Sequence, residues 1–323
     1  MIITRTPFRV SFAGGGTDLR EFYLKNGYGA VVSAAINRYM YIIIHPYFHD
    51  KIRIKYSKTE DVENIHEIEH PIVRECLKKV RIEKGLEIAS FADVPAGTGL
   101  GSSSSFTVGL LNALYAYKGG IVSKEKLAQE ACEIEIEILG EPIGKQDQYA
   151  AAYGNINYIR FNKDETVDVS PIFLTDATKN KLENNLYLYY IGGKRKAGDI
   201  LDEQKENISN DDKFQNLKKM VMLTDELREA LHAEKINTVG DLLHKGWLYK
   251  KELASGISNE SIDDLYDRAI KYGARGGKLL GAGGTGFLLI YSENHETLRE
   301  QLGCKILPFN IDREGTKILF YNL

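Results

Sequence analysis

The order of apolar and polar residues divides the chain into a first half that mixes strands with helices and a second half dominated by long helices. In the first half, Tyr39–His45 and Lys51–Tyr56 have the β-branched and aromatic content of strands. A further strand, Arg9–Phe12, ends at a glycine-rich turn that a helical pattern follows. This mixture predicts an α+β fold.

Two helices of the first half carry an apolar stripe that would bury against neighbouring elements. The stripe of Phe106–Lys118 consists of Phe106, Leu110, Leu114 and Tyr117. The stripe of Lys124–Gly140 consists of Leu127, Ala131, Ile134 and Ile138. Because a helix turns by about 100° per residue, Glu135 falls on the second stripe, whereas Glu133 and Glu137 point away. We therefore expect Glu135 to face the interior.

A polar stretch, Asp176–Asn185, precedes the strand-like run Leu186–Ile191, and we place a domain boundary there. Beyond it, long helical patterns and a later strand predict a second α+β domain. The expected helices are Phe214–Leu231, Val239–Leu253 and Ile262–Tyr272, and the strand is Phe287–Tyr291. The predicted domains are residues 1–183 and 184–323.

Composition and charge narrow the class of protein. The formal net charge is −3, with acids and bases mixed along the chain, so nucleic acid is not an expected partner. No apolar stretch approaches the roughly 20 residues that span a bilayer, and the first residues lack the apolar core of a signal peptide. We therefore expect a cytoplasmic protein without a membrane partner. The three cysteines form no CxxC pair and the seven histidines no HExxH motif, so a structural or catalytic zinc site is not indicated.

The most informative segment is Pro95–Ser105, with the sequence PAGTGLGSSSS, which leads directly into the helix that begins near Phe106. Glycines allow the backbone to approach an anion closely, and a helix N-terminus presents free N–H groups and the positive end of its dipole. The pattern therefore favours a phosphate-binding loop. The alternative, a flexible turn with an ordinary serine cap, stays open on this segment alone. Neither a Walker A motif nor a dinucleotide-binding fingerprint fits the spacing.

Two other glycine-rich loops are less specific by themselves. Gly281–Gly286 matches GxGxxG by letter, but it leads into the strand Phe287–Tyr291 and not into a helix, which excludes a Rossmann motif there. Near the start of the chain, Ala13–Asp18 reads AGGGTD. In isolation, that sequence would indicate only a turn.

Taken together and in order, these segments resemble the three motifs of the GHMP kinases, a superfamily named after galactokinase, homoserine kinase, mevalonate kinase and phosphomevalonate kinase. The matching segments are Pro7–Asp18 (PFRVSFAGGGTD), Pro95–Ser105 and Lys278–Phe287 (KLLGAGGTGF). AGGGTD together with Gly144–Tyr149 (GKQDQY) is most similar to the D-glycero-D-manno-heptose 7-phosphate kinases of bacterial surface-sugar synthesis. The resemblance implies a ribosomal-S5-like N-terminal domain that binds ATP, a ferredoxin-like C-terminal domain, and an active site between them.

The resemblance also implies roles for individual residues in phosphoryl transfer, which needs bound phosphates, charge neutralisation and a group that takes the acceptor proton. Asp147 matches the catalytic base, and Arg9 matches an arginine close to the reaction centre. The residues expected to bind ATP are Gly97, Thr98, Gly99, Leu100, Gly101, Ser102, Ser103 and Ser104. For Asp147, a carboxylate on a surface turn is the alternative.

A Mg²⁺ ion would need oxygen ligands, and Ser103 and Glu135 are the expected pair. A buried carboxylate is costly unless a cation accompanies it, which gives the inward-facing Glu135 a reason to be there. An internal salt bridge is the alternative for Glu135, and the sequence does not separate Ser103 from Ser102 or Ser104 as the hydroxyl ligand.

On the acceptor side, Asp18 matches a carboxylate that receives sugar hydroxyls. The other residues expected to contact the acceptor are Gly15, Gly16, Thr17, Gly283 and Gly284, although a purely structural turn is the alternative for the last two. Galactokinases carry a bulky Glu-His pair where this chain has Gly15 and Gly16, which argues against plain galactose. Gly192–Lys196 (GGKRK) lies between a strand and a helical stretch, and Arg195 is expected to bind a second phosphate there. A solvated cationic cluster is the alternative.

We therefore expect an ATP- and Mg²⁺-dependent kinase that phosphorylates the anomeric C1 hydroxyl of D-glycero-D-manno-heptose 7-phosphate to give the 1,7-bisphosphate. A kinase for another sugar such as L-fucose, or a regulator that binds ATP and sugar without catalysis, are the alternatives. The complete set of catalytic residues favours catalysis. The oligomeric state is left open.

Overall fold

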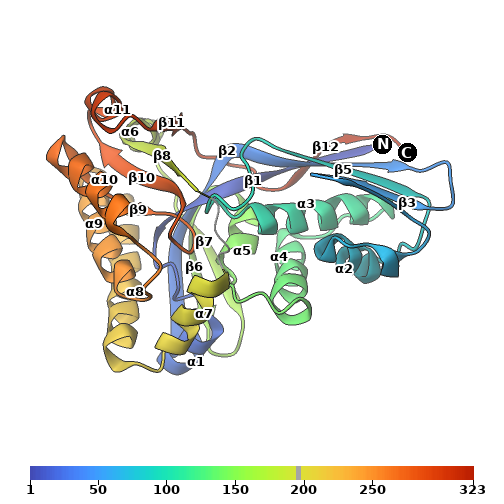
Figure 1. The fold of residues 1–323 in the computed structure, drawn as a ribbon, viewed down its shortest axis with the longest axis horizontal. Coiled ribbons are helices and arrows are strands. Elements are labelled where there is room, and N and C mark those ends of the chain that lie inside the picture. The colour runs from blue at the N-terminus through green and yellow to red at the C-terminus, as the bar shows by residue number, and fades with distance from the viewer. Residues whose placement is uncertain (194–197) are drawn as a thin grey trace.

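The computed structural model describes residues 1–193 and 198–323. These residues form two adjoining units, each a β-sheet with helices packed against it (Figure 1). An eight-stranded sheet lies in the first unit and a four-stranded sheet in the second, counting the described strands. No helix in the described ranges is long and apolar enough to cross a membrane.

The first sheet is built around a long antiparallel pair, β1 (Ile2–Ala13) and β2 (Tyr28–Pro46). One half of β2 pairs with β6 and the other half with β5, so the sheet divides into two arms along this strand. Five further strands extend the two arms: β3 (Ile52–Lys55), β4 (Thr59–Val62), β5 (Leu86–Ala92), β6 (Ile156–Asn162) and β7 (Val167–Pro171). The strands expected in the first half of the chain are thus confirmed.

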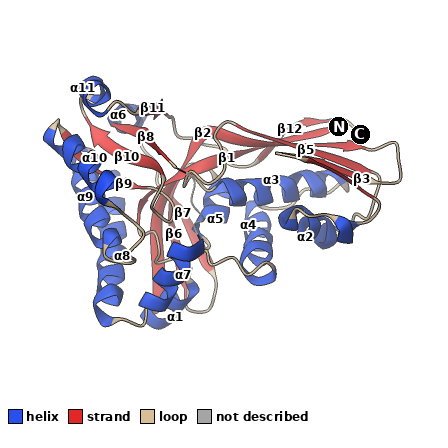
Figure 2. Cartoon of the chain, in the orientation of Figure 1, coloured by secondary structure: helices blue, strands red, loops and turns tan. Residues whose placement is uncertain are grey.

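Helices cover one face of this sheet (Figure 2). They are α1 (Arg20–Asn26), α2 (Pro71–Val80), α3 (Ser102–Tyr117), α4 (Lys124–Cys132) and α5 (Gln146–Tyr153), with a short 3₁₀ turn, η1 (Ile65–Glu67). Helix α3 packs against the sheet on one side and against α2, α4 and α5 on the others. It is therefore buried on more than the predicted stripe, and Val108, Leu111 and Ala113 are buried as well. This helix is the central element of the first unit.

After Cys132 the chain winds more widely, as the π-helix η2 (Glu133–Ile138). Glu135 is buried there, as expected, and Glu137 is exposed. Ile138, however, is 49% exposed, so the prediction that it belongs to the buried stripe was wrong. A π-helix has more residues per turn than an α-helix, so the stripe drifts off the buried face by its last member.

The second sheet has the order β11, β8, β10, β9, and its strands are β8 (Leu186–Gly192), β9 (Ala274–Leu279), β10 (Gly286–Ser292) and β11 (Lys305–Pro308). The helices of this half are α6 (Asp176–Asn185), α7 (Gly198–Asn207), α8 (Asp211–His232), α9 (Asn237–Lys251), α10 (Glu260–Lys271) and α11 (His295–Leu302). The polar stretch expected as an interdomain segment is itself helix α6, capped by the Thr175 hydroxyl and anchored by buried Leu182. The change from one sheet to the other occurs immediately after it, at β8.

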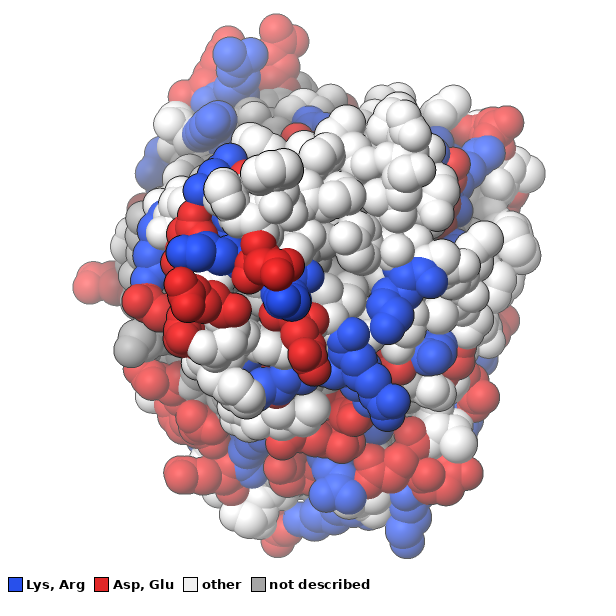
Figure 3. Space-filling model, turned by 90° about the vertical axis from the view of Figure 1, so that its right-hand side faces the viewer, with Lys and Arg blue, Asp and Glu red and all other residues white. Residues whose placement is uncertain are grey.

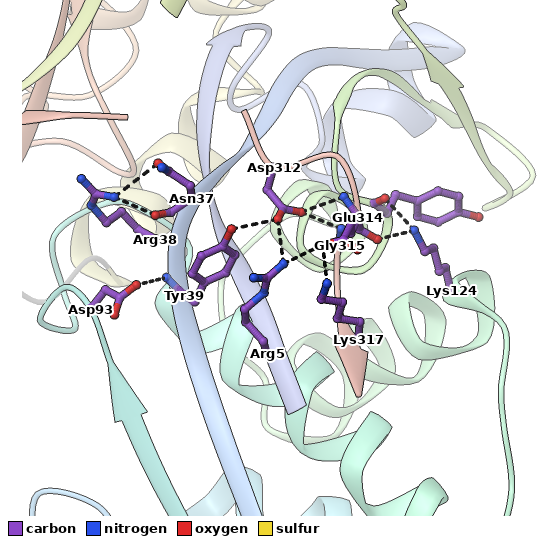
Figure 4. Close-up of polar contacts among 11 residues, drawn as sticks. Arg5, Asn37, Arg38, Tyr39, Asp93, Lys124, Asp312, Glu314, Gly315 and Lys317 are labelled. Atoms are coloured by element: carbon purple, nitrogen blue, oxygen red, sulfur yellow. Dashed lines mark hydrogen bonds and ion pairs between the residues drawn. The ribbon is translucent and has the colours of Figure 1, made fainter. Parts of the chain in front are cut away.

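The end of the chain returns to the first sheet, where β12 (Lys317–Tyr321) pairs with β1. The preceding turn is fastened by Asp312 (Figure 4), which accepts hydrogen bonds from the Tyr39 hydroxyl at 3.0 Å and from the Gly315 N–H at 2.7 Å. Arg5 pairs with Glu314 at 2.8 Å beside it. The ranges 1–183 and 184–323 therefore do not describe the two units fully, because β12 follows the second unit in sequence but belongs to the sheet of the first.

On the molecular surface, positive and negative side chains are interspersed (Figure 3). The face shown also carries a broad area without charged residues. This arrangement reflects the mixed acids and bases of the sequence.

Candidate active site

The loop Pro95–Gly101, here called the phosphate loop, ends where α3 begins. Gly101 precedes the helix with a positive φ of 74°, and no side chain caps the first turn. The N–H groups of this turn are therefore free to bind an anion. Residues of the loop and of the first helical turn line a cavity of about 250 Å³: Gly97, Gly99, Gly101, Ser102, Ser103 and Ser104. Thr98 and Leu100 are buried beside it, and the Thr98 hydroxyl donates to the Pro95 carbonyl at 2.9 Å.

The third glycine loop, Gly281–Gly286, packs directly on the phosphate loop. A Cβ at Gly281 would lie 2.6 Å from the Gly99 Cα, and one at Gly99 would lie 2.7 Å from the Leu280 carbonyl oxygen. Both residues also have positive φ, so glycine is required for two reasons. The second unit therefore supports the phosphate loop through backbone contact.

Arg9 and Asp147 form a two-point ion pair at the edge of this loop. Arg9 Nε and Nη2 each lie 2.7 Å from a different carboxylate oxygen of Asp147, and Nη1 donates to the Gly99 carbonyl at 2.6 Å. Gly101 leaves room for the carboxylate, because a Cβ there would lie 3.2 Å from Asp147 Oδ2. β1, α5 and the phosphate loop are thus joined at the residues expected to carry out catalysis.

Asp18 lies in the same cavity, where two backbone N–H groups orient it. Gly16 donates to one oxygen at 3.0 Å and Gln146 to the other at 3.2 Å. Burial, and then the negative charge of Asp147, raise the pKa of Asp18. Gly144 is adjacent, and any Cβ at that position would collide with the Asp18 carboxylate. A carboxylate held in this way can accept hydroxyl hydrogen bonds from a ligand.

The residues expected to contact the acceptor divide into two groups. Gly15, Gly16 and Asp18 line the cavity. Thr17 does not, because its hydroxyl donates to the Ala30 carbonyl at 2.7 Å within the framework. Nor do Gly283 and Gly284, which pack against Ile257; the Gly284 N–H donates to the Ile257 carbonyl at 2.9 Å. Gly281 and Ala282 line the cavity in their place. Arg195 lies outside the described residues.

The expected metal ligands, Ser103 and Glu135, are in contact. The Ser103 hydroxyl donates to Glu135 Oε1 at 2.6 Å, and the Gln148 amide donates to Oε2 at 2.7 Å. Burial raises the pKa of Glu135, and these two hydrogen bonds lower it in part. Within the described ranges, no group of three or more His, Cys, Asp or Glu side chains could hold a metal by itself. One hydroxyl and one carboxylate next to a phosphate loop fit Mg²⁺, which is bound through few protein oxygens together with phosphate oxygens and water.

Several cavity residues were not anticipated: Ser11, Gln146, Gln204, Lys250 and Lys278. Two of them left a signal in the sequence, because a lysine at 250 continues the helical stripe of Val239, Leu243 and Trp247, and Lys278 stands in a strand with buried neighbours. Ser11 and Gln146 stand within the motifs Pro7–Asp18 and Gly144–Tyr149, but no pattern distinguishes them from their neighbours there. Gln204 left no signal, since isolated glutamine residues are common on protein surfaces.

Comparison with known proteins gives two family matches. The family model described as GHMP kinases N terminal domain matches residues 66–155, and that described as GHMP kinases C terminal matches residues 227–307.

Individual relatives cover nearly the whole chain. D-glycero-alpha-D-manno-heptose 7-phosphate kinase of Campylobacter jejuni is 29% identical over 98% of both chains. A bifunctional fucokinase/GDP-fucose pyrophosphorylase of Arabidopsis thaliana is 28% identical over 91% of this chain and 30% of its own length. A crystal structure of a D-glycero-D-manno-heptose 1-phosphate kinase from Bacteroides thetaiotaomicron superposes with a TM-score of 0.82 at 24% identity, covering 100% of both chains.

Proposed function

The chain belongs to the GHMP kinases, and from that premise we propose that it transfers a phosphoryl group from ATP to the anomeric C1 hydroxyl of D-glycero-D-manno-heptose 7-phosphate, giving the 1,7-bisphosphate. The observation that carries the proposal is the convergence of Arg9, Asp18 and Asp147 with the phosphate loop in one cavity. Such a site has what phosphoryl transfer requires: an anion cradle, an acceptor-orienting carboxylate and a proton acceptor.

In the proposed reaction, the free N–H groups at the start of α3 hold the nucleotide phosphates. Asp18 accepts hydrogen bonds from sugar hydroxyls and orients the ring. The Asp147 carboxylate takes the proton of the C1 hydroxyl as that oxygen attacks phosphorus. Arg9 fixes the Asp147 carboxylate through both of its oxygens and neutralises charge next to the phosphate loop.

Ser103 and Glu135 would hold the Mg²⁺ ion, whose contribution is to neutralise the phosphate charge and lower the barrier to transfer. Because the Ser103 hydroxyl donates to Glu135, the two oxygens are already in one place. The hydrogen bond from Gln148 leaves the second oxygen of Glu135 occupied and so fixes the carboxylate.

The heptose acceptor is supported by similarity to the heptose 7-phosphate kinase, and by Gly15 and Gly16, whose small size leaves space next to Asp18. An L-fucose kinase is the second candidate, because the fucokinase relative is 28% identical. A sensor without catalysis is the third, but such a protein has no need of the Arg9–Asp147 pair.

A coupled assay for ADP release, with the acceptor varied, tests the proposal. We expect turnover with heptose 7-phosphate and a product whose ³¹P spectrum contains an anomeric phosphate. Preferential turnover of L-fucose would favour the second candidate. Binding of ATP and sugar without any ADP release would favour the sensor and contradict the kinase.

A further inference from the structure

Two buried lysines in the active-site cavity have no role in the proposed reaction. Lys250 comes from α9 and Lys278 from β9, and both line the cavity that holds Arg9, Asp18 and Asp147. Their exposed fractions are 4% and 3%. Lysine is almost never buried to this extent without a partner for its charge.

Neither lysine side chain forms an ion pair within the described parts of the chain. Lys250 donates to the carbonyls of Leu279, at 3.1 Å, and Gly281, which leaves one of its three N–H donors unused. Apart from the backbone pairing of β9 with β10, Lys278 makes no hydrogen bond or ion pair with any described residue. The second unit therefore brings two lysine side chains without a carboxylate partner into the cavity.

The nearby carboxylates are engaged elsewhere. Both oxygens of Asp147 are bound by Arg9, and both oxygens of Asp18 accept backbone N–H groups. Burial, followed by the charge of Arg9, lowers the pKa of Lys250 to about 7, and the charges of Asp18 and Asp147 offset only part of this effect. Burial and the charges of Lys250 and Arg9 lower the pKa of Lys278 well below its ordinary value, against a smaller opposing contribution from Asp18. An anion bound between the two lysines would remove this penalty.

Neutral donors line the same cavity without partners. The Ser11 hydroxyl and the Gln204 amide nitrogen are buried and have no hydrogen-bond partner among the described residues. Unused N–H and O–H donors beside two ammonium groups suit an anion with several acceptor oxygens. A phosphate group has these properties, whereas a single carboxylate offers fewer acceptors.

We propose that Lys250 and Lys278 form a second phosphate-binding site, on the wall of the cavity supplied by the second unit and apart from the N-terminus of α3. The inference rests on the proposed function, since it assumes a kinase that handles phosphate groups here. Two sources present the same chemistry: the phosphate that the acceptor already carries, and the terminal phosphoryl group of ATP. If the phosphate is the one carried by the acceptor, the two lysines would form its binding site among the described residues.

The first test does not depend on the acceptor. With ADP saturating, so that the phosphate loop is filled, inorganic phosphate should bind the wild-type protein in a calorimetric titration. Lys278→Met should weaken this binding by at least about tenfold, the loss expected for a charge-assisted contact. Lys278→Arg should retain most of the binding. Lys245→Met, which removes an exposed lysine of the same helix as Lys250, is the matched control and should bind as the wild type does.

A second set of titrations identifies the source of the phosphate. If Lys278→Met weakens heptose 7-phosphate but not free heptose, the site receives the acceptor's phosphate. If it weakens a non-hydrolysable ATP analogue but not ADP, the site receives the terminal phosphoryl group. Lys250→Met should weaken binding of the same ligand as Lys278→Met does.

Folded Lys278→Met protein that binds inorganic phosphate and all four ligands as tightly as the wild type would overturn the inference. Lack of heptose binding by the wild type would instead contradict the proposed acceptor, while the phosphate and nucleotide titrations would still decide the inference. Folding of the variant is checked by its melting temperature, which should equal or exceed that of the wild type, because a buried polar group without a partner is replaced by an apolar side chain.

Discussion

Arg9 binds both carboxylate oxygens of Asp147. Replacing one of these oxygens by an NH₂ group therefore alters both the proton transfer and the Arg9–Asp147 ion pair. In Asp147→Asn, the amide group cannot accept the acceptor proton, and its NH₂ faces the guanidinium. We expect turnover to fall by about 10²-fold or more, with the Kd for ADP nearly unchanged. Steady-state kinetics and calorimetry measure the two quantities. Near-normal turnover would remove Asp147 from the role of base.

The paired oxygens of Ser103 and Glu135 lead to a second prediction at this scale. Glu135→Gln and Ser103→Ala should each raise the Mg²⁺ concentration needed for half-maximal turnover and lower kcat. Ser102→Ala is the matched control, since Ser102 also lines the cavity but makes no contact with Glu135 among the hydrogen bonds of the described residues. If all three variants share the Mg²⁺ dependence of the wild type, the proposed metal ligands are wrong.

The buried Lys250 links stability to pH. Its pKa is about 7 in the folded protein, whereas an unfolded lysine keeps its proton up to an ordinary pKa of about 10.4. Between these values the unfolded chain binds more protons, so the contribution of Lys250 to stability increases as the pH rises from about 7 toward 10. Urea unfolding of the ligand-free protein at several pH values should show a flatter dependence for Lys250→Met than for the wild type. Equal slopes would contradict a neutral Lys250.

The roles of single residues could be predicted from the sequence where the residue belongs to a local pattern. The inward position of Glu135 followed from helical periodicity, and Asp147 and Arg9 followed from motifs. Thr17 stood in a motif but serves the framework, because sequence adjacency does not determine which way a side chain points. Ser11 and Gln204 belong to segments far apart in the chain, so only the folded arrangement reveals that they share a cavity.

At the scale of elements, the contact between the two glycine loops can be tested by paired substitutions. Gly281 and Gly273 both have positive φ, so alanine strains the backbone at either position. Only Gly281 is also packed against the phosphate loop, and nothing lies within 4 Å of a Cβ at Gly273. Gly281→Ala should therefore weaken ADP binding by about tenfold or more, whereas Gly273→Ala should lower stability alone. Equal ADP affinities in titrations of the two variants would show that the contact does not shape the loop.

Elements with a strong local pattern were predictable, and those set by tertiary packing were not. Helices α3 and α9 and the strands within β2, β3 and β10 followed from periodicity and β-propensity. The π-helix η2 did not, because the apolar residues of Lys124–Gly140 are spaced as in an α-helix. Helix α6 is so polar that its sequence resembles a linker. The burial of Leu182, which stabilises this segment as a helix, is evident only in the folded protein.

For the molecule as a whole, the turn fastened by Asp312 determines how firmly β12 is attached. Asp312→Ala removes an acceptor of several hydrogen bonds in a buried place and leaves the Tyr39 hydroxyl and the Gly315 N–H without their partner. We expect a loss of about 2–4 kcal/mol in unfolding free energy. The neighbouring Arg313→Ala breaks only an exposed ion pair with Asp176 and should cost less than about 1 kcal/mol. Denaturant unfolding compares the two, and equal losses would contradict this role of Asp312.

The pairing of β12 with β1 also has a consequence for the way the protein is made. During translation β1 leaves the ribosome well before β12, its neighbour on one side, because most of the described elements lie between the two strands. Until those residues leave the ribosome, one edge of the nascent sheet exposes unpaired N–H and C=O groups, which can recruit a strand of another chain. We therefore expect ribosome-bound chains to be prone to aggregate during this interval, and we expect a chaperone that shields this edge to increase the yield of folded protein.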